Sequence, residues 1–120
     1  LRTGEHVDDS ILQMKKNNIT SSISVVKLKK SPYKSFIIDE NKGRLKSLFN
    51  EKLSNFRRQD LPDVYIPNCA MYFFSITDFI SRDGFPSNGS MPYIMSDEDS
   101  IDIDRKSDIQ KAAKILRSKT

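Results

Sequence analysis

The sequence predicts a small α/β fold with an incomplete sheet. Segments with helical and strand periodicity alternate along the chain. The 120 residues, of which 37% are hydrophobic, suit one compact domain spanning residues 1–120. Only one pair of strands is joined by a clear crossover, and several apolar strands lack a helix to cover them. We therefore expect the sheet to need a partner.

The first two elements are an amphipathic helix and a largely buried strand. Thr3 is a suitable N-cap, and apolar residues recur near helical spacing up to Asn17. Acidic residues in the first turns suit the helix dipole. The run from Ser22 to Lys29 then alternates as a strand does.

A β-hairpin is predicted next, formed by residues 35–39 and 44–49 around a turn that ends at Gly43. Residues 50–63 contain few apolar side chains, so we expect an irregular loop there. Together these segments form an excursion from the domain over about residues 35–67.

The remaining chain predicts short strands and helices. We expect a strand over 70–76, a helical turn capped by Thr77 and running to Ile80, and a strand over 91–95. Residues 100–104 are predicted to be extended. A final helix follows, with one apolar face formed by Ile109, Ala112, Ala113 and Leu116.

Composition limits the classes of function. No apolar run is long enough to span a bilayer, and no secretion signal is present, so we expect a cytoplasmic protein without a membrane partner. The single cysteine, Cys69, agrees with a reducing compartment. The charge of +4 is spread among acidic residues, which disfavours nucleic-acid binding.

Two aspartates are candidate metal ligands. In an extended segment over 100–104, Asp102 and Asp104 point to the same side. Hard oxygen ligands so placed suit Mg²⁺ shared with substrate phosphates. The alternative is a helix N-terminus that carries acidic residues, and spacing alone favours this alternative.

Basic residues offer candidate anion contacts. Arg58, next to Arg57, can pair with a carboxylate or phosphate, or it is an ordinary exposed residue. Lys27, Lys29, Lys30 and Lys34 form the densest basic cluster, for which protection of an edge strand is the simpler explanation. The only histidine, His6, has no second ligand nearby to support a zinc site.

Several motifs, in order, resemble the acylneuraminate cytidylyltransferases, or CMP-sialic acid synthetases. The start of the chain, Leu1-Arg2-Thr3, is similar to the end of that family's Gln-Pro-Thr-Ser-Pro-Leu-Arg segment. The other matching segments are Ser31-Pro32-Tyr33-Lys34, Arg58-Gln59-Asp60-Leu61-Pro62, Pro67-Asn68-Cys69-Ala70-Met71-Tyr72, Tyr93-Ile94-Met95 and Ser100-Ile101-Asp102-Ile103-Asp104.

The resemblance implies a nucleotidyltransferase that moves CMP from CTP to a nonulosonic sugar acid with Mg²⁺. It implies part of a Rossmann-like sheet with a protruding hairpin used for dimerisation, and hence a homodimer or higher oligomer. Asp102 and Asp104 match the family's metal-associated pair. The positions that match the sugar site are Lys34, Arg58, Asn68, Tyr72 and Phe85.

The chain departs from the family pattern in three respects. Ile66 stands where sialic acid synthetases commonly have Arg, and Cys69 stands where they have Gly. The family's CTP-binding loop, Ala-Arg-x-Gly-Ser-Lys, has no counterpart. We therefore expect a truncated cytidylyltransferase that is inactive alone. The alternatives are a free-standing sugar-acid-binding or oligomerising module, and a small basic interaction protein.

Overall fold

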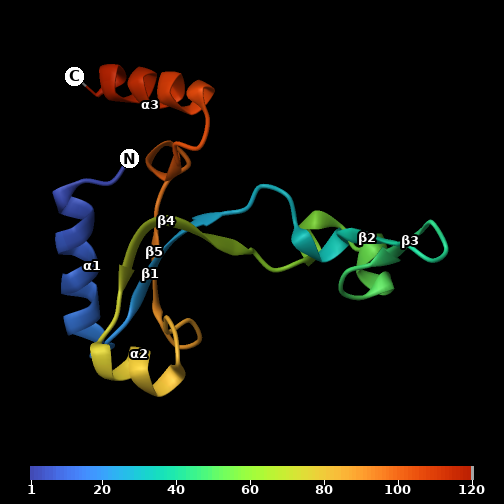
Figure 1. The fold of residues 1–120 in the computed structure, drawn as a ribbon, viewed down its shortest axis with the longest axis horizontal. Helices are drawn as coiled ribbons and strands as arrows, with labels where there is room; N and C mark the ends of the chain where they lie inside the picture. The colour runs from blue at the N-terminus through green and yellow to red at the C-terminus, as the bar shows by residue number, and fades with distance from the viewer. Residues whose placement is uncertain (120) are drawn as a thin grey trace. The chain divides into compact units, whose positions relative to one another are not determined.

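The computed structural model describes residues 1–119, and its helices and strands alternate along the chain as the sequence predicts. Over these residues it has three α-helices, a mixed three-stranded sheet and a separate two-stranded hairpin. The chain divides into two compact units (Figure 1). The first unit comprises residues 1–26 and the chain from Ile66 onward, and the second unit comprises residues 27–65.

Helix α1 spans Gly4–Asn17 and confirms the predicted N-terminal helix. The Thr3 hydroxyl accepts a hydrogen bond from the His6 backbone N–H, and His6 Nδ1 accepts one from the Thr3 N–H. These reciprocal bonds satisfy donors that the helix itself leaves unpaired. The helix ends at Asn18, which has the left-handed φ of 54° that often terminates helices.

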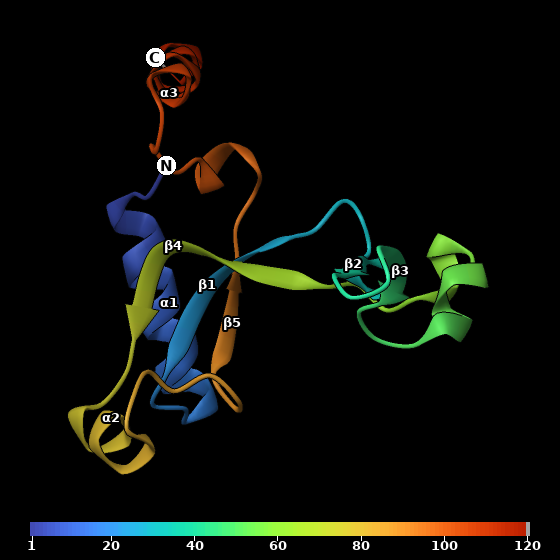
Figure 2. The ribbon, with the colours of Figure 1, turned by 45° about the vertical axis from the view of Figure 1, so that its right-hand side comes forward.

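The sheet of the first unit has the strand order β4-β1-β5, formed by Tyr65–Phe73, Ser22–Lys27 and Met91–Ile94. Strands β1 and β5 are parallel, with Ser24 opposite Tyr93. Strand β4 runs in the opposite direction, and α1 lies alongside the sheet (Figures 1 and 2). The predicted crossover therefore corresponds to the parallel β1–β5 pair.

The core of the first unit is small. Its buried apolar side chains include Met71, Met95 and Ala112, whereas the most deeply buried side chains in the described residues are the serines Ser10, Ser22 and Ser24. Serine adds little apolar area, so burial of these residues contributes little hydrophobic stabilisation. Many large apolar residues remain exposed instead, as the predicted incomplete sheet requires.

The structure corrects the predicted boundaries around β4. The strand covers 65–73 rather than 70–76, because β4 lies at one edge of the sheet, where Pro67 costs no ladder hydrogen bond. The prediction that Thr77 caps the next helix is wrong. Helix α2 spans Ile76–Arg82, and the Ser75 hydroxyl accepts the capping bond from the Asp78 N–H.

The predicted extended segment over 100–104 is also wrong in part. Residues Glu98–Ser100 form a 3₁₀ turn, closed by a 2.6 Å hydrogen bond from the Ser100 hydroxyl to the Ser96 carbonyl. Residues 101–104 follow without joining a strand ladder. Helix α3 then spans Lys106–Ser118, and it confirms the predicted final helix.

The second unit contains the predicted hairpin. Strands β2, Phe36–Asp39, and β3, Arg44–Ser47, are antiparallel. The Asp39 carbonyl accepts bonds from the N–H groups of Lys42 and Gly43, and Gly43 has the positive φ expected of it, 63°. The predicted irregular stretch after the hairpin contains two short 3₁₀ helices, Glu51–Asn55 and Arg58–Asp60.

Candidate functional site

The candidate site in the first unit is built around a distortion of β4 at residues 68–70. Cys69 has φ of 62°, in the left-handed region that side chains with a Cβ rarely adopt. Such a conformation costs about 1–2 kcal/mol. The surrounding hydrogen bonds must therefore hold the backbone in place.

Asn68 supplies those hydrogen bonds. Its side-chain oxygen accepts from the Ser24 hydroxyl at 2.6 Å and from the Ala70 N–H at 3.1 Å. Its amide nitrogen donates to the Ser100 hydroxyl at 3.0 Å and contacts the sulfur of Met95 at 3.3 Å. Both donors and both acceptor positions of the amide are thus used within the protein. This geometry makes Asn68 a positioning residue that joins β4 to β1 and to the 98–100 turn.

A shallow cavity of about 280 Å³ lies beside this distortion. Asn68, Cys69 and Asp102 line it, together with Leu1, Arg2, Ala70, Asp99 and Ile101. The Arg2 guanidinium donates to the Ala70 carbonyl at 2.9 Å, which fixes one side of the opening. The fold thereby brings two of the predicted site residues, Asn68 and Asp102, to one cavity although they are far apart in sequence.

Tyr72 and Phe85 form a second group of predicted site residues. Their ring centroids lie 5.7 Å apart, and Phe85 also contacts Phe74 and Phe79 edge-on. Burial is the largest cause that raises the pKa of the Tyr72 hydroxyl, followed by the charge of Cys69 and then by a hydrogen bond with it. Tyr72 stays protonated near neutral pH and is therefore a hydrogen-bond donor next to Cys69.

The two predicted metal ligands have different surroundings. Asp102 belongs to the cavity wall, whereas Asp104 is not among its lining residues. The Asp104 N–H donates to the Asp108 carboxylate at 3.2 Å, which places Asp104 at the start of α3. Over residues 1–119, no three His, Cys, Asp or Glu side chains gather as a metal-binding group.

Lys34 and Arg58 belong to the second unit. Lys34 is the last residue of the 3₁₀ helix Pro32–Lys34 and is half-buried. Arg58 begins the 3₁₀ helix Arg58–Asp60, is exposed, and lines a small cavity with Lys27, Lys29 and Lys30. Within this unit the structure thus brings Arg58 to the basic cluster that the sequence singled out.

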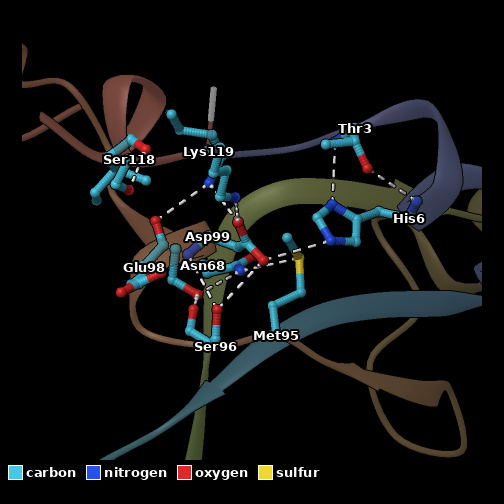
Figure 3. A network of polar contacts seen from close by, with 12 residues as sticks. Thr3, His6, Asn68, Met95, Ser96, Glu98, Asp99, Ser118 and Lys119 are labelled. Carbon is cyan, nitrogen blue, oxygen red and sulfur yellow. Dashed lines mark hydrogen bonds and ion pairs between the residues drawn. The ribbon is translucent and has the colours of Figure 1, made fainter. Parts of the chain in front are cut away.

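Sequence reasoning missed Asp99, to which it assigned no role. The Asp99 carboxylate lies 2.7 Å from Lys119 Nζ and 3.5 Å from His6 Nε2, so it connects the end of α3 to the start of α1 (Figure 3). The hydrogen bond from Lys119, helped by the N-terminal amino group, outweighs burial and lowers the Asp99 pKa to about 2. No local pattern marks this residue, because its partners lie at both ends of the chain.

No known family model matches this sequence. A search for membrane-spanning segments is also negative, since none of the helices in residues 1–119 is both long and apolar enough to cross a bilayer.

Proposed function

We propose that these residues form the sugar-side part of a cytidylyltransferase that transfers CMP from CTP to a sialic-acid-type nonulosonic acid. The observation that carries the proposal is the backbone at Cys69. The motif resemblance aligns this residue with a family glycine, and its φ of 62° is a conformation that glycine adopts freely. The resemblance rests on side-chain identities alone, so the backbone conformation is a separate observation in its support.

The aromatic side chains of Tyr72 and Phe85 provide a surface that the sugar can contact. Tyr72 and Phe85 are 40% and 61% exposed, so their rings can contact a ligand while they contact each other. An aromatic wall suits the acyl group of the sugar. In this proposal Asn68 does not contact the sugar. It holds the distorted part of β4 in place, and β4 also carries Tyr72.

Asp102 and Asp104 are the residues that would hold Mg²⁺. Proteins commonly supply one or two carboxylates to this ion, while water and substrate phosphates complete its coordination. Both aspartates are exposed and therefore accessible to such a shared ion. When bound, Mg²⁺ would neutralise charge on the nucleotide phosphates.

Turnover of CTP and a nonulosonic acid tests the enzymatic part of the proposal. We expect no CMP-sugar from residues 1–120 alone with Mg²⁺, because the family's phosphate-binding loop is not among them. Robust turnover would contradict the requirement for that loop.

The coding sequence upstream of Leu1 provides a second test. An in-frame Ala-Arg-x-Gly-Ser-Lys segment there would support the proposal of an enzyme, and a stop codon would contradict it.

Calorimetry with the sugar acid tests the binding part. We expect Tyr72→Ala to weaken binding about tenfold, since loss of an aromatic contact costs about 1 kcal/mol or more. Phe56→Ala is the control, because Phe56 is an exposed aromatic residue outside the predicted site. Equal effects of the two substitutions would contradict the role of Tyr72.

The second candidate is a free-standing sugar-acid-binding or oligomerising module. The exposed apolar residues favour it, among them Ile38 and Leu45, which face each other in the hairpin and are 66% and 67% exposed. Binding of the sugar acid by a gene product that lacks the upstream loop would support this candidate over the enzyme.

A further inference from the structure

The positive charge of the chain is concentrated in the second unit. Residues 27–65 contain ten Lys and Arg against five Asp and Glu, whereas the whole chain has 20 and 16. The net charge of +4 therefore arises from this unit, and the rest of the chain is slightly acidic. Such a local excess attracts anions even when the total charge is modest.

A small cavity lies among these cations. It has a volume of about 80 Å³, and it is lined by residues 27–31, Arg58 and residues 61–64. A hydrogen bond of 2.8 Å from the Leu28 N–H to the Val64 carbonyl joins its two walls, and the buried Leu61 is part of its lining. A cavity of this size suits one compact group.

The carboxylates near the cavity form ion pairs with only some of the Lys and Arg side chains around it. Asp63 pairs with Lys27 at 3.2 Å, and Asp60 pairs with Arg57 at 3.5 Å. Over residues 1–119, the side chains of Lys30 and Arg58 take part in no hydrogen bond or ion pair. Two cations thus line the cavity without a partner in the described part of the chain.

A neutral donor lies beside them. The Ser31 hydroxyl oxygen accepts a hydrogen bond from the Tyr33 N–H at 3.3 Å, and its own proton remains available to donate. Arg offers a planar pair of donors to an oxyanion, and Lys offers a compact charge. Together these groups suit several oxygens on one centre.

We propose that this cavity is a binding site for a compact dianionic oxyanion of the phosphate class, held by Lys30, Arg58 and Ser31. The excess of cations matches a dianion better than a carboxylate, which carries one charge. Arg58 also matches a sugar-site position of the family that the sequence resembles, but the present proposal does not depend on that match. Inorganic phosphate alone tests it, so its failure would leave the sugar-acid proposal intact.

An NMR titration of residues 1–120 with inorganic phosphate is the test, at low chloride and about pH 8, where phosphate is mainly dianionic. We expect saturable shifts at the amides of residues 27–31 and 58–64. Lys30→Ala/Arg58→Ala should weaken binding at least about tenfold, since it removes two charge-assisted contacts. Shifts that do not saturate would overturn the proposal.

The matched control is Lys42→Ala/Arg44→Ala, which removes the same charge from the hairpin, away from the cavity. It should change the affinity less than about twofold. Equal weakening by both double variants would show attraction to the general charge and overturn the site. If circular dichroism shows that the first double variant is unfolded, Arg58→Gln replaces it, and an unchanged affinity of that variant would overturn the proposal.

Acetate distinguishes the class of ligand in the same titration. We expect acetate to bind at least about tenfold more weakly than phosphate, because it brings one charge instead of two. Equal affinities would contradict the assignment to dianions.

Discussion

Single residues carry the main strain in this protein, and Cys69 is the clearest case. Its left-handed backbone is held by the hydrogen bonds that the Asn68 side chain accepts from the Ser24 hydroxyl and from the Ala70 N–H. The side chain of Cys69 is exposed and contributes little packing. The position therefore favours a residue without a Cβ.

We predict that Cys69→Gly stabilises the protein by about 1 kcal/mol, because glycine relieves the left-handed strain at the cost of some unfolded-state entropy. Urea unfolding measures the change in free energy. Ala70→Gly, in the same strand but without a positive φ, is the control and should destabilise by about 1 kcal/mol. Stabilisation by both substitutions, or by neither, would contradict the explanation.

Ser10 is a second residue in an unfavourable environment. Its hydroxyl is buried in α1 and has no hydrogen-bond partner within the described residues. Ser10→Ala removes an unsatisfied polar group and improves helix propensity, so it should stabilise by about 1–2 kcal/mol. Thermal unfolding checks this. Ser107→Ala, on the exposed surface of α3, should change stability by less than about 0.5 kcal/mol.

Asp99 determines how stability responds to acid. Its pKa falls from 3.8 to about 2 on folding, so the carboxylate stabilises the folded state above pH 4. That contribution is lost as the pH falls from about 4 towards 2. We expect Asp99→Asn to flatten the stability profile over this window, measured by urea unfolding at several pH values. An unchanged slope would show that Asp99 is not the responsible group.

Among the helices and strands, the two N-caps differ in whether local sequence predicts them correctly. The start of α1 was predicted at Thr3, and the structure places its N-cap there. The start of α2 was predicted at Thr77 and lies at Ser75. Both hydroxyls are suitable caps, and only the path of β4 into α2 decides between them.

The cap of α2 can be tested directly. Ser75→Ala should destabilise the protein by about 1 kcal/mol, because the Asp78 N–H loses its bond to the hydroxyl. Thr77→Ala should change stability by less than about 0.5 kcal/mol, since Thr77 is exposed and already inside the helix. A larger effect of Thr77→Ala would favour the cap expected from sequence.

At the scale of the whole molecule, the chain exposes more surface than its mass accounts for. Its accessible area is 9589 Å², whereas a compact 13.8 kDa monomer exposes about 6600 Å². Even two separate compact bodies with the sizes of the two units would expose about 7900 Å². The difference, about 1700 Å², is about twice the roughly 800 Å² that each partner buries in a standard protein interface.

We therefore predict that the chain self-associates, as the resemblance also implies. Light scattering should give a mass of at least a dimer, and Ile38→Lys/Leu45→Lys should reduce it towards the monomer, because two charges would enter the exposed hairpin pair. Ile76→Lys/Ile80→Lys, which adds the same charge to exposed positions of α2, is the control. A monomeric unmodified chain would contradict the prediction.

Local sequence patterns were sufficient to predict the α/β class, α1, the hairpin with its glycine turn and the final helix, because each rests on contacts between near neighbours. The bounds of β4, the cap of α2 and the pairing of Asp99 with Lys119 and His6 could be seen only in the folded structure. It also brought Asp102 to the cavity beside Cys69. These features depend on residues far apart in the chain, whose proximity is fixed by strand pairing and packing rather than by local propensity.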